Sequence, residues 1–274
     1  MNVYDSERII ESLNTTHDLV NEPDEADVIL LNTCHIREKA AEKVYSEVGK
    51  YSILKKKHKD LKIVVAGCVA QAEGKAMLQR QPIIDTIIGP QMYQDLPKIL
   101  SKNDNKKSVN LEFEDEKKFF KLGAKRINAQ LSSYLTIQEG CDKFCSFCVV
   151  PFTRGAEFSR KVEDIINEAR SLSERGSKEI ILLGQNVNAF HGIYNGGIQY
   201  NLSKLIRELE KIKGLERITY TTSHPRDMEQ DLIDLHGESQ KLNPYLHLPV
   251  QSGSDFILNK MNRKYSSKDY IKII

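Results

Sequence analysis

The sequence predicts an α/β protein in which an open parallel α/β sheet is followed by a β/α barrel. Short apolar runs alternate with longer stretches of helical periodicity, which is typical of βαβ units. The later strands each end in a polar loop with Gly or Ser, as on the active-site face of β/α barrels. At 274 residues, with 40% hydrophobic and 28% charged residues, the chain has the size and composition of one or two globular domains.

Residues 1–100 form the first predicted domain. Asp5 or Ser6 can cap a first helix that runs to about Leu13. This domain begins on a helix, with no strand in front of it. Further apolar runs predict strands at 28–31, 63–66 and 83–88, and the stretches between and after them predict helices at 36–56, 70–79 and 91–100.

Residues 101–126 are polar and charged, and we expect a linker or an exposed hairpin there. The basic stretch 117–126 indicates a solvated face, with contact to phosphates as the alternative.

Residues 127–274 form the second predicted domain, with four β/α units. The expected strands are 134–138, 179–183, 217–220 and 245–248, and the expected helices are 162–174, 202–211, 229–235, 255–260 and 268–274.

Composition and charge exclude some classes of protein. No apolar stretch approaches the ~20 residues of a membrane span, and the start of the chain is not a signal peptide. We therefore expect a cytoplasmic protein without a membrane partner. The net charge of +2 gives no argument for nucleic acid. Five cysteines, three of them clustered, favour metal over disulfides in a reducing compartment.

Cys141, Cys145 and Cys148 follow the first strand of the second domain, with three and then two residues between them. This spacing predicts an iron–sulfur cluster held by three thiolates, with one iron left open to bind and reduce a small molecule. The alternative is a structural zinc site, which normally needs four ligands, the fourth of which His191 could supply.

Cys34 and Cys68 each end a buried strand of the first domain. Because parallel strands end at the same edge of a sheet, both thiols belong to the edge where α/β ligands bind. A second cluster is the functional interpretation, and inert packing is the alternative. Two ligands are too few for a stable cubane.

Other candidate residues lie in the loops that follow the barrel strands. Arg154 is a candidate to bind a carboxylate, and the 184–186 loop (Gly184, Gln185, Asn186) to bind an amine; ordinary loop turns are the alternative. His224 and His247 lie on the same face, where each alone is more often a hydrogen-bonded loop residue than an acid–base group.

These motifs together resemble the radical S-adenosylmethionine methylthiotransferases over essentially the whole chain. The matching segments are 1–7, 31–40, 66–68, 140–151, 183–187, 222–225 and 248–254. The run Asn-Thr-Cys-His-Ile-Arg at 32–37 resembles the tRNA branch, which modifies N6-isopentenyladenosine beside the anticodon. It argues against the sister branch, which acts on a ribosomal-protein aspartate.

The resemblance implies a transferase with two [4Fe–4S] clusters and S-adenosylmethionine. Cys141, Cys145 and Cys148 would hold the cluster whose open iron binds S-adenosylmethionine. Reductive cleavage would give a 5′-deoxyadenosyl radical that takes hydrogen from carbon 2 of the adenine, where sulfur is inserted and then methylated. Cys34 and Cys68 would help to hold the second cluster, and the 184–186 loop would seat the nucleoside. The expected partners are tRNA and a flavodoxin- or ferredoxin-type electron donor, and we expect a monomer.

The chain departs from the family pattern at both ends. A first strand ending in Phe-Gly-Cys-Gln, which carries the third ligand of the second cluster, is absent. The radical SAM barrel is incomplete, with four of about six units, and the RNA-binding domain is missing. An inactive or split remnant that only binds a cluster is therefore an alternative. We expect the isolated chain to be poorly stable, because exposed sheet edges outweigh the ~5–15 kcal/mol of net domain stability.

Overall fold

The computed structural model describes residues 1–35, 38–101, 106–113, 126 and 129–274. By their contacts they divide into two compact units. The N-terminal unit comprises Asn2–Leu122 with Phe152–Gly155, and the C-terminal unit comprises Met1, Gly123–Pro151 and Ala156–Ile274. Each contains a parallel sheet with helices, so the predicted α/β class is confirmed. No helix among the described residues is long and apolar enough to cross a lipid bilayer.

The N-terminal unit is built on a four-stranded parallel sheet in the order β1-β2-β3-β4. The strands are β1 (Val28–Thr33), β2 (Lys62–Gly67), β3 (Thr86–Ile88) and β4 (Ser108–Asn110). The first three were predicted. The fourth lies in the range predicted as a linker, and it pairs with the free edge of β3, where Ser108 Oγ donates to Thr86 Oγ1 at 3.2 Å. Residues 102–105 and 114–125, which include most of the basic stretch, lie outside the described residues.

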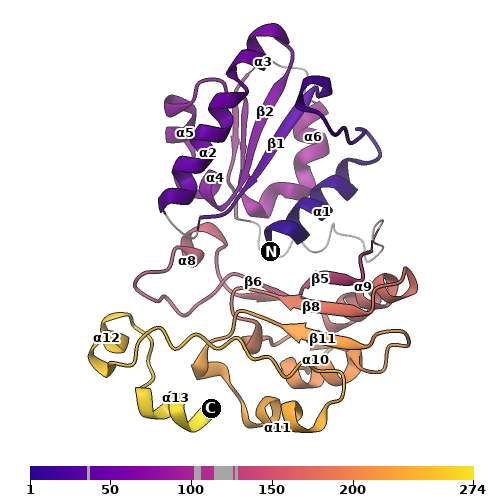
Figure 1. Cartoon of the computed structure of the whole chain (residues 1–274), viewed down its shortest axis with the longest axis vertical. Coiled ribbons are helices and arrows are strands. Elements are labelled where there is room, and N and C mark those ends of the chain that lie inside the picture. The colour runs from indigo at the N-terminus through magenta and orange to yellow at the C-terminus, as the bar shows by residue number, and fades with distance from the viewer. Residues whose placement is uncertain (36–37, 102–105, 114–125, 127–128) are drawn as a thin grey trace. The chain divides into compact units, whose positions relative to one another are not determined.

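Two hydrophobic cores cover the two faces of this sheet. Ile63 and Val65 of β2 belong to one core, and the alternate residues Val64 and Ala66 to the other. This alternation follows from the two-residue period of a strand, and burial on both faces explains the continuous apolar run. Figure 1 shows α1 and α6 on one face and α2, α4 and α5 on the other. The helices are α1 (Asn2–Leu13), α2 (Glu38–Lys50), α3 (Ser52–Lys57), α4 (Cys68–Glu73), α5 (Lys75–Arg80) and α6 (Leu96–Ser101).

Three predicted helices are each broken into two elements. The helix expected at 70–79 divides at Gly74, whose φ of +50° ends α4 and starts α5. The helix expected at 91–100 consists of the 3-10 helix η2 (Pro90–Asp95) and α6, because Pro97 has no N–H and is tolerated only in a first helical turn. The helix expected at 36–56 becomes α2 and α3, which join at Tyr51; residues 36–37 lie outside the described residues.

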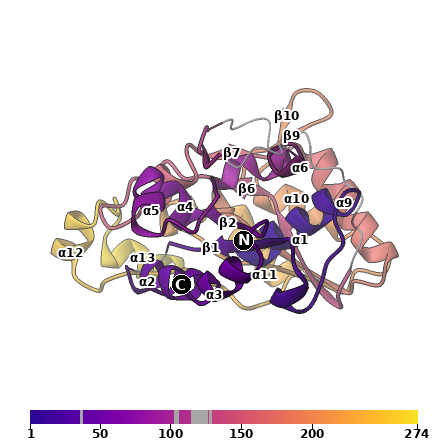
Figure 2. The same ribbon diagram turned by 90° about the horizontal axis from the view of Figure 1, so that it is seen from above.

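The C-terminal unit contains a three-stranded parallel sheet in the order β11-β8-β5. Its strands are β5 (Ser132–Thr136), β8 (Glu179–Leu183) and β11 (Arg217–Tyr220), and its longer helices are α9 (Val162–Glu174), α10 (Leu202–Leu209), α11 (Gln230–Glu238), α12 (Asp255–Lys260) and α13 (Ser267–Ile273). Buried residues of α9, α10 and α11 share one core with the strands. The last two helices lie side by side in both views (Figure 1; Figure 2), and Ser267 N donates to Asp255 Oδ1 at 2.6 Å.

Short elements complete this half of the sequence. They are the antiparallel pair β6 (Gln138–Glu139) and β7 (Phe158–Ser159), the hairpin of β9 (Ile193–Tyr194) and β10 (Ile198–Gln199), the helix α8 (Val150–Thr153), and the 3-10 helices η3 (Val187–Ala189) and η4 (Pro225–Asp227).

The strand predicted at 245–248 does not form. The chain makes only an isolated bridge with β11, between Leu242 and Ile218. Pro244 follows two residues later and has no N–H to donate to a ladder, and Pro249 ends the segment. The prediction of four β/α strands is therefore wrong for this segment.

A buried ion cluster anchors the strand that leads into the cysteine loop. Glu168 of α9 accepts from Arg126 at 3.1 Å and from Arg160 at 2.9 Å, and all three side chains are at most 2% exposed. The two guanidinium groups also donate to the carbonyl oxygens of Tyr134 and Thr136, both in β5. Arg126, predicted to be solvated as part of the basic stretch, is therefore a core residue.

Replacing Glu168 by Gln removes the buried carboxylate that the guanidinium groups of Arg126 and Arg160 share. We expect Glu168→Gln to lower the free energy of unfolding by about 3–5 kcal/mol, measured by urea unfolding with circular dichroism. Glu174→Gln is the matched control, because Glu174 is an exposed residue at the end of the same helix. Equal stability of the two variants would contradict a structural role for the cluster.

Candidate active site

The three clustered cysteines lie in the loop that follows β5 and β6. Cys145 is buried, and Cys141 and Cys148 are half-buried. Two tight bends shape the loop, at Gly140 (φ +75°) and at Phe144 (φ +48°), which is left-handed without being glycine. Inside the loop Cys148 N donates to Cys145 O at 2.9 Å. The predicted position of the triplet at a strand end is confirmed.

The thiols lie close enough to influence one another. Burial, together with negative charge on Glu157, Cys148 and Cys145, raises the pKa of Cys141 to about 11. Burial also raises the pKa of Cys148. Without metal both thiols are therefore protonated at neutral pH, and a bound metal has to displace their protons.

The described part of the chain shows no ready-made site for a single metal ion at the cysteine loop. In the part of the chain that the structure describes, no three His, Cys, Asp or Glu side chains converge on one metal-ion position. A cubane does not require such convergence, because each thiolate binds a different iron. His191, the possible fourth zinc ligand, instead contacts Glu157 Oε1 at 3.2 Å and Ala189 O at 3.0 Å.

The buried amide of Gln138 joins the cysteine loop to the 184–186 loop. Its Nε2 donates to Gly140 O at 2.9 Å, while its Oε1 accepts from Gln185 N at 3.0 Å and from Asn186 N at 3.1 Å. Gln185 completes the connection, because its Oε1 accepts from Gly140 N at 2.6 Å. The structure thus brings the predicted loop residues next to the cysteine loop.

Gly184 and Asn186 have distinct local environments. A Cβ on Gly184 would lie 2.4 Å from Gln138 Oε1 and 3.0 Å from Gln138 O, so only glycine permits this approach. Asn186 is buried, and its Nδ2 donates to Asp227 Oδ2 at 2.7 Å, while Lys143 pairs with the other carboxylate oxygen. Among the described residues, Asn186 Oδ1 is buried without a hydrogen-bond partner, so it is an acceptor available to a ligand.

Cys34 and Cys68 follow neighbouring strands at one edge of the N-terminal sheet. Thr33 and Gly67, the last residues of β1 and β2, are register partners. A Cβ on Gly67 would lie 2.2 Å from Thr33 O, so glycine is required where the two backbones meet. This is the arrangement that the sequence predicted.

Arg154 belongs by its contacts to the N-terminal unit. It is buried, its Nε donates to Cys68 Sγ at 3.3 Å, and its Nη2 pairs with Asp5 Oδ2 at 2.8 Å. Its charge is thus already engaged by a carboxylate of the protein, and a role in binding the carboxylate of a cofactor stays a prediction.

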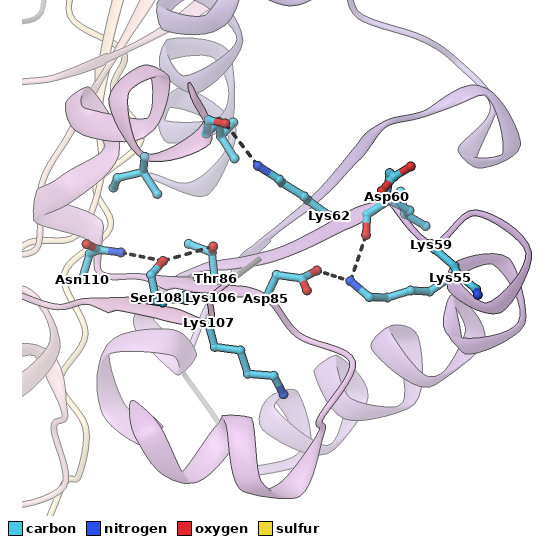
Figure 3. A pocket seen from close by; sticks show the side chains of 13 residues that line it. Lys55, Lys59, Asp60, Lys62, Asp85, Thr86, Lys106, Lys107, Ser108 and Asn110 are labelled. Atoms are coloured by element: carbon cyan, nitrogen blue, oxygen red, sulfur yellow. Dashed lines mark hydrogen bonds and ion pairs between the residues drawn. The ribbon is translucent and has the colours of Figure 1, made fainter. Parts of the chain in front are cut away.

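A lysine-lined pocket of about 440 Å³ lies at the amino ends of the strands of the same sheet, opposite the ends that Cys34 and Cys68 follow (Figure 3). Lys62 and Asp85 come from the amino ends of β2 and β3. Lys55 points to Asp85 and pairs with it (Figure 3). The other charged residues of the lining are Lys59, Asp60, Lys106 and Lys107, so positive charge is in excess.

Sequence reasoning missed several residues that shape the cysteine loop. They are Gln138, Asp227, Lys143 and the residues 260–263, of which Arg263 donates to Cys145 Sγ at 3.3 Å. They carry no motif of their own, and only the fold brings residue 263 beside residue 145.

Comparison with known proteins decides the family. Residues 1–89 match the family described as "Uncharacterized protein family UPF0004", and residues 135–274 match the "Radical SAM superfamily". The chain belongs to the radical SAM superfamily. This membership implies a [4Fe–4S] cluster and S-adenosylmethionine as cofactors.

Curated relatives of this radical SAM protein carry the name "tRNA-2-methylthio-N(6)-dimethylallyladenosine synthase". The protein of Jannaschia sp. (strain CCS1) is 57% identical over an alignment 276 positions long, which covers 100% of this chain and 60% of the relative. That of Ehrlichia canis (strain Jake) is 54% identical over an alignment 281 positions long, which covers 100% of this chain and 63% of the relative. The resemblance to the tRNA branch is thus confirmed. The chain spans about three fifths of the length of these relatives.

Solved structures of other radical SAM enzymes share the fold. The methyltransferase TsrM from Kitasatospora setae has a TM-score of 0.64 at 12% identity, over 100% of this chain and 62% of that chain. The cobalamin-dependent enzyme OxsB has a TM-score of 0.62 at 15% identity, over 97% of this chain and 40% of that chain.

The contact between Gly184 and Gln138 predicts the effect of one added methyl group. We expect Gly184→Ala to lower the free energy of unfolding by about 1–3 kcal/mol, because it displaces a backbone carbonyl as well as the Gln138 amide. In Gly237→Ala, the control in α11, the new Cβ meets no atom within 4 Å, and we expect a gain of up to about 1 kcal/mol. A neutral Gly184→Ala in urea unfolding would contradict the close approach.

His224 predicts a pH dependence of stability. Burial, with a smaller effect of the Arg263 charge, lowers the pKa of His224 from 6.5 to about 4. Below pH 6.5 His224 therefore binds a proton in the unfolded chain but not in the folded chain. The free energy of unfolding falls as the pH drops from about 6.5 towards about 4. We expect a loss of roughly 1–3 kcal/mol.

The test is urea unfolding of the metal-free chain between pH 7.5 and pH 4. His224→Gln should reduce the slope of stability with pH, whereas His58→Gln, at an exposed site, should leave it unchanged. An unaltered slope in His224→Gln would contradict the assignment.

Proposed function

We propose that this chain carries the catalytic part of a tRNA methylthiotransferase that modifies N6-isopentenyladenosine (also called N6-dimethylallyladenosine) at carbon 2. The observation that carries the proposal is the 57% identity, across all of this chain, to a relative named for that reaction. The cysteine loop of the C-terminal unit supports it, because the loop lies at the end of parallel strands, where β/α enzymes place their chemistry.

Cys141, Cys145 and Cys148 would hold the radical-generating cluster. When bound, this cluster supplies the electron that cleaves S-adenosylmethionine reductively. The loop already has the bends that present its three thiols, and Gln138 fixes its first residue. Partial burial of the thiols restricts water around the metal.

The 184–186 loop would bind S-adenosylmethionine beside that cluster. Asn186 Oδ1, buried and without a partner, can accept a hydrogen bond from an amino or hydroxyl group of the cofactor. Asp227 holds the amide of Asn186 in the orientation that leaves this oxygen available. Gly184 keeps the loop within reach of Gln138.

Cys34 and Cys68 would supply two ligands of a second [4Fe–4S] cluster near the sulfur that is inserted. Their matched positions after β1 and β2 support this role. Arg154 would donate to the Cys68 sulfur, with Asp5 holding its guanidinium. The lysine-lined pocket in the same unit would offer contacts to RNA phosphates. A flavodoxin- or ferredoxin-type donor and a cytoplasmic monomer complete the proposal.

Anaerobic reconstitution tests the proposal. Iron and sulfide are counted, 5′-deoxyadenosine release is measured, and tRNA that carries N6-isopentenyladenosine is analysed by mass spectrometry for the methylthio group. About eight irons per chain with a methylthiolated product supports the two-cluster enzyme. Cys148→Ala should abolish release of 5′-deoxyadenosine, whereas Cys68→Ala should retain it and lose thiolation.

The remaining outcomes separate the alternatives. About four irons with S-adenosylmethionine cleavage but no thiolation would overturn the second cluster while keeping the first. Bound iron without cleavage would favour an inactive remnant. Thiolation of a ribosomal-protein aspartate instead of tRNA would point to the sister activity. Tight binding of one zinc ion in place of iron would contradict every version of the proposal.

A further inference from the structure

Arg263 is a buried cation whose contacts converge on the cysteine loop. It is 5% exposed, and its Nη1 donates to Cys145 Sγ at 3.3 Å. Its Nη2 donates to Pro249 O at 3.2 Å and its Nε to Tyr265 Oη at 3.2 Å. The guanidinium carbon lies 5.3 Å from the centre of the Tyr265 ring. All of these residues belong to the C-terminal unit.

The charge of Arg263 has no carboxylate partner in the described part of the chain. The ion pairs found there involve other cations, and the oxygens that accept from Arg263 are neutral. A buried charge is costly unless it is paired with an opposite charge. The one acceptor of Arg263 that becomes negative on binding metal is the sulfur of Cys145.

The segment that carries Arg263 is fastened to the cysteine loop by hydrogen bonds that do not involve its guanidinium. Ser146 N donates to Met261 O at 3.1 Å, and Ser146 Oγ donates to Lys260 O at 2.8 Å. Asn262 adds a third bond, because its Nδ2 donates to Phe144 O at 2.9 Å. The bonds made by residues 260–262 therefore hold the neighbouring Arg263 at a fixed position beside Cys145.

We propose that Arg263 is a positioning residue that balances the charge of the cluster at Cys141, Cys145 and Cys148 and raises its reduction potential. The inference rests on the cluster of the proposed function. Reduction adds one electron from a low-potential donor, and the added negative charge is stabilised by a nearby buried cation that donates an N–H···S bond. Removing the cation therefore makes the cluster harder to reduce.

The test is a potentiometric titration of the reconstituted chain, followed by electron paramagnetic resonance of the reduced cluster. In Arg263→Gln the ratio of reduced to oxidised cluster at a fixed potential should fall about tenfold, which for one electron is ~59 mV towards negative values. Arg263→Lys keeps the charge without the planar fork and should recover part of the shift. Arg207→Gln, at an exposed arginine of α10, should change nothing.

Several results would overturn the inference. One is an unchanged potential in Arg263→Gln at full iron loading. Another is loss of iron from both Arg263→Gln and Arg263→Lys while circular dichroism shows a folded chain. That result would indicate that cluster binding depends on the shape of the arginine side chain and not on its charge. Loss of iron from Arg263→Gln alone, restored in Arg263→Lys, supports it. The unmodified chain is the control for the proposed function. If it fails to load a cluster, the proposed function and this inference both fail; if it loads one, the Arg263 variants test the inference alone.

Discussion

The buried amide of Gln138 is the interaction on which the candidate active site depends. Gln138 is the first residue of β6, and its amide binds both the loop that carries the cysteines and the loop that follows β8. Parallel strands alone bring these loops to one edge of the sheet, but they do not fix the distance between them. Gly184 admits the amide, and Gln185 closes the network from the other side. These hydrogen bonds thereby hold the cysteine loop and the 184–186 loop together.

Buried arginines place positive charge beside two of the cysteine sulfur atoms. Each of two cysteines, Cys68 and Cys145, accepts from a buried arginine at 3.3 Å. Arg154 is paired with Asp5, whereas Arg263 donates to neutral oxygens besides the sulfur and has no carboxylate partner among the described residues. The two sulfur atoms thus lie in surroundings of different local net charge, and an iron–sulfur cluster at each would be stabilised differently on reduction.

Local sequence signals predicted most of the fold, and they failed where a single residue overrides periodicity. Helix α9 and strands β8 and β11 have the predicted bounds. Buried residues recur at helical spacing in α9, and short apolar stretches mark the two strands. Gly74 and Pro97 divide helices whose pattern looks continuous, and Pro244 prevents a strand. In the site, the cysteine triplet was predictable from its spacing, and the 184–186 loop from its place after a strand. Arg263 was not, because it reaches Cys145 across 118 residues through tertiary packing.

The central claim is that the cluster at Cys141, Cys145 and Cys148 keeps one iron open for S-adenosylmethionine. The most direct measurement is electron paramagnetic resonance of the reduced, reconstituted chain with and without S-adenosylmethionine. The account predicts a changed signal when the cofactor is added, because its amino and carboxylate groups bind that iron. A signal from a loaded cluster that stays the same at saturating cofactor would contradict it.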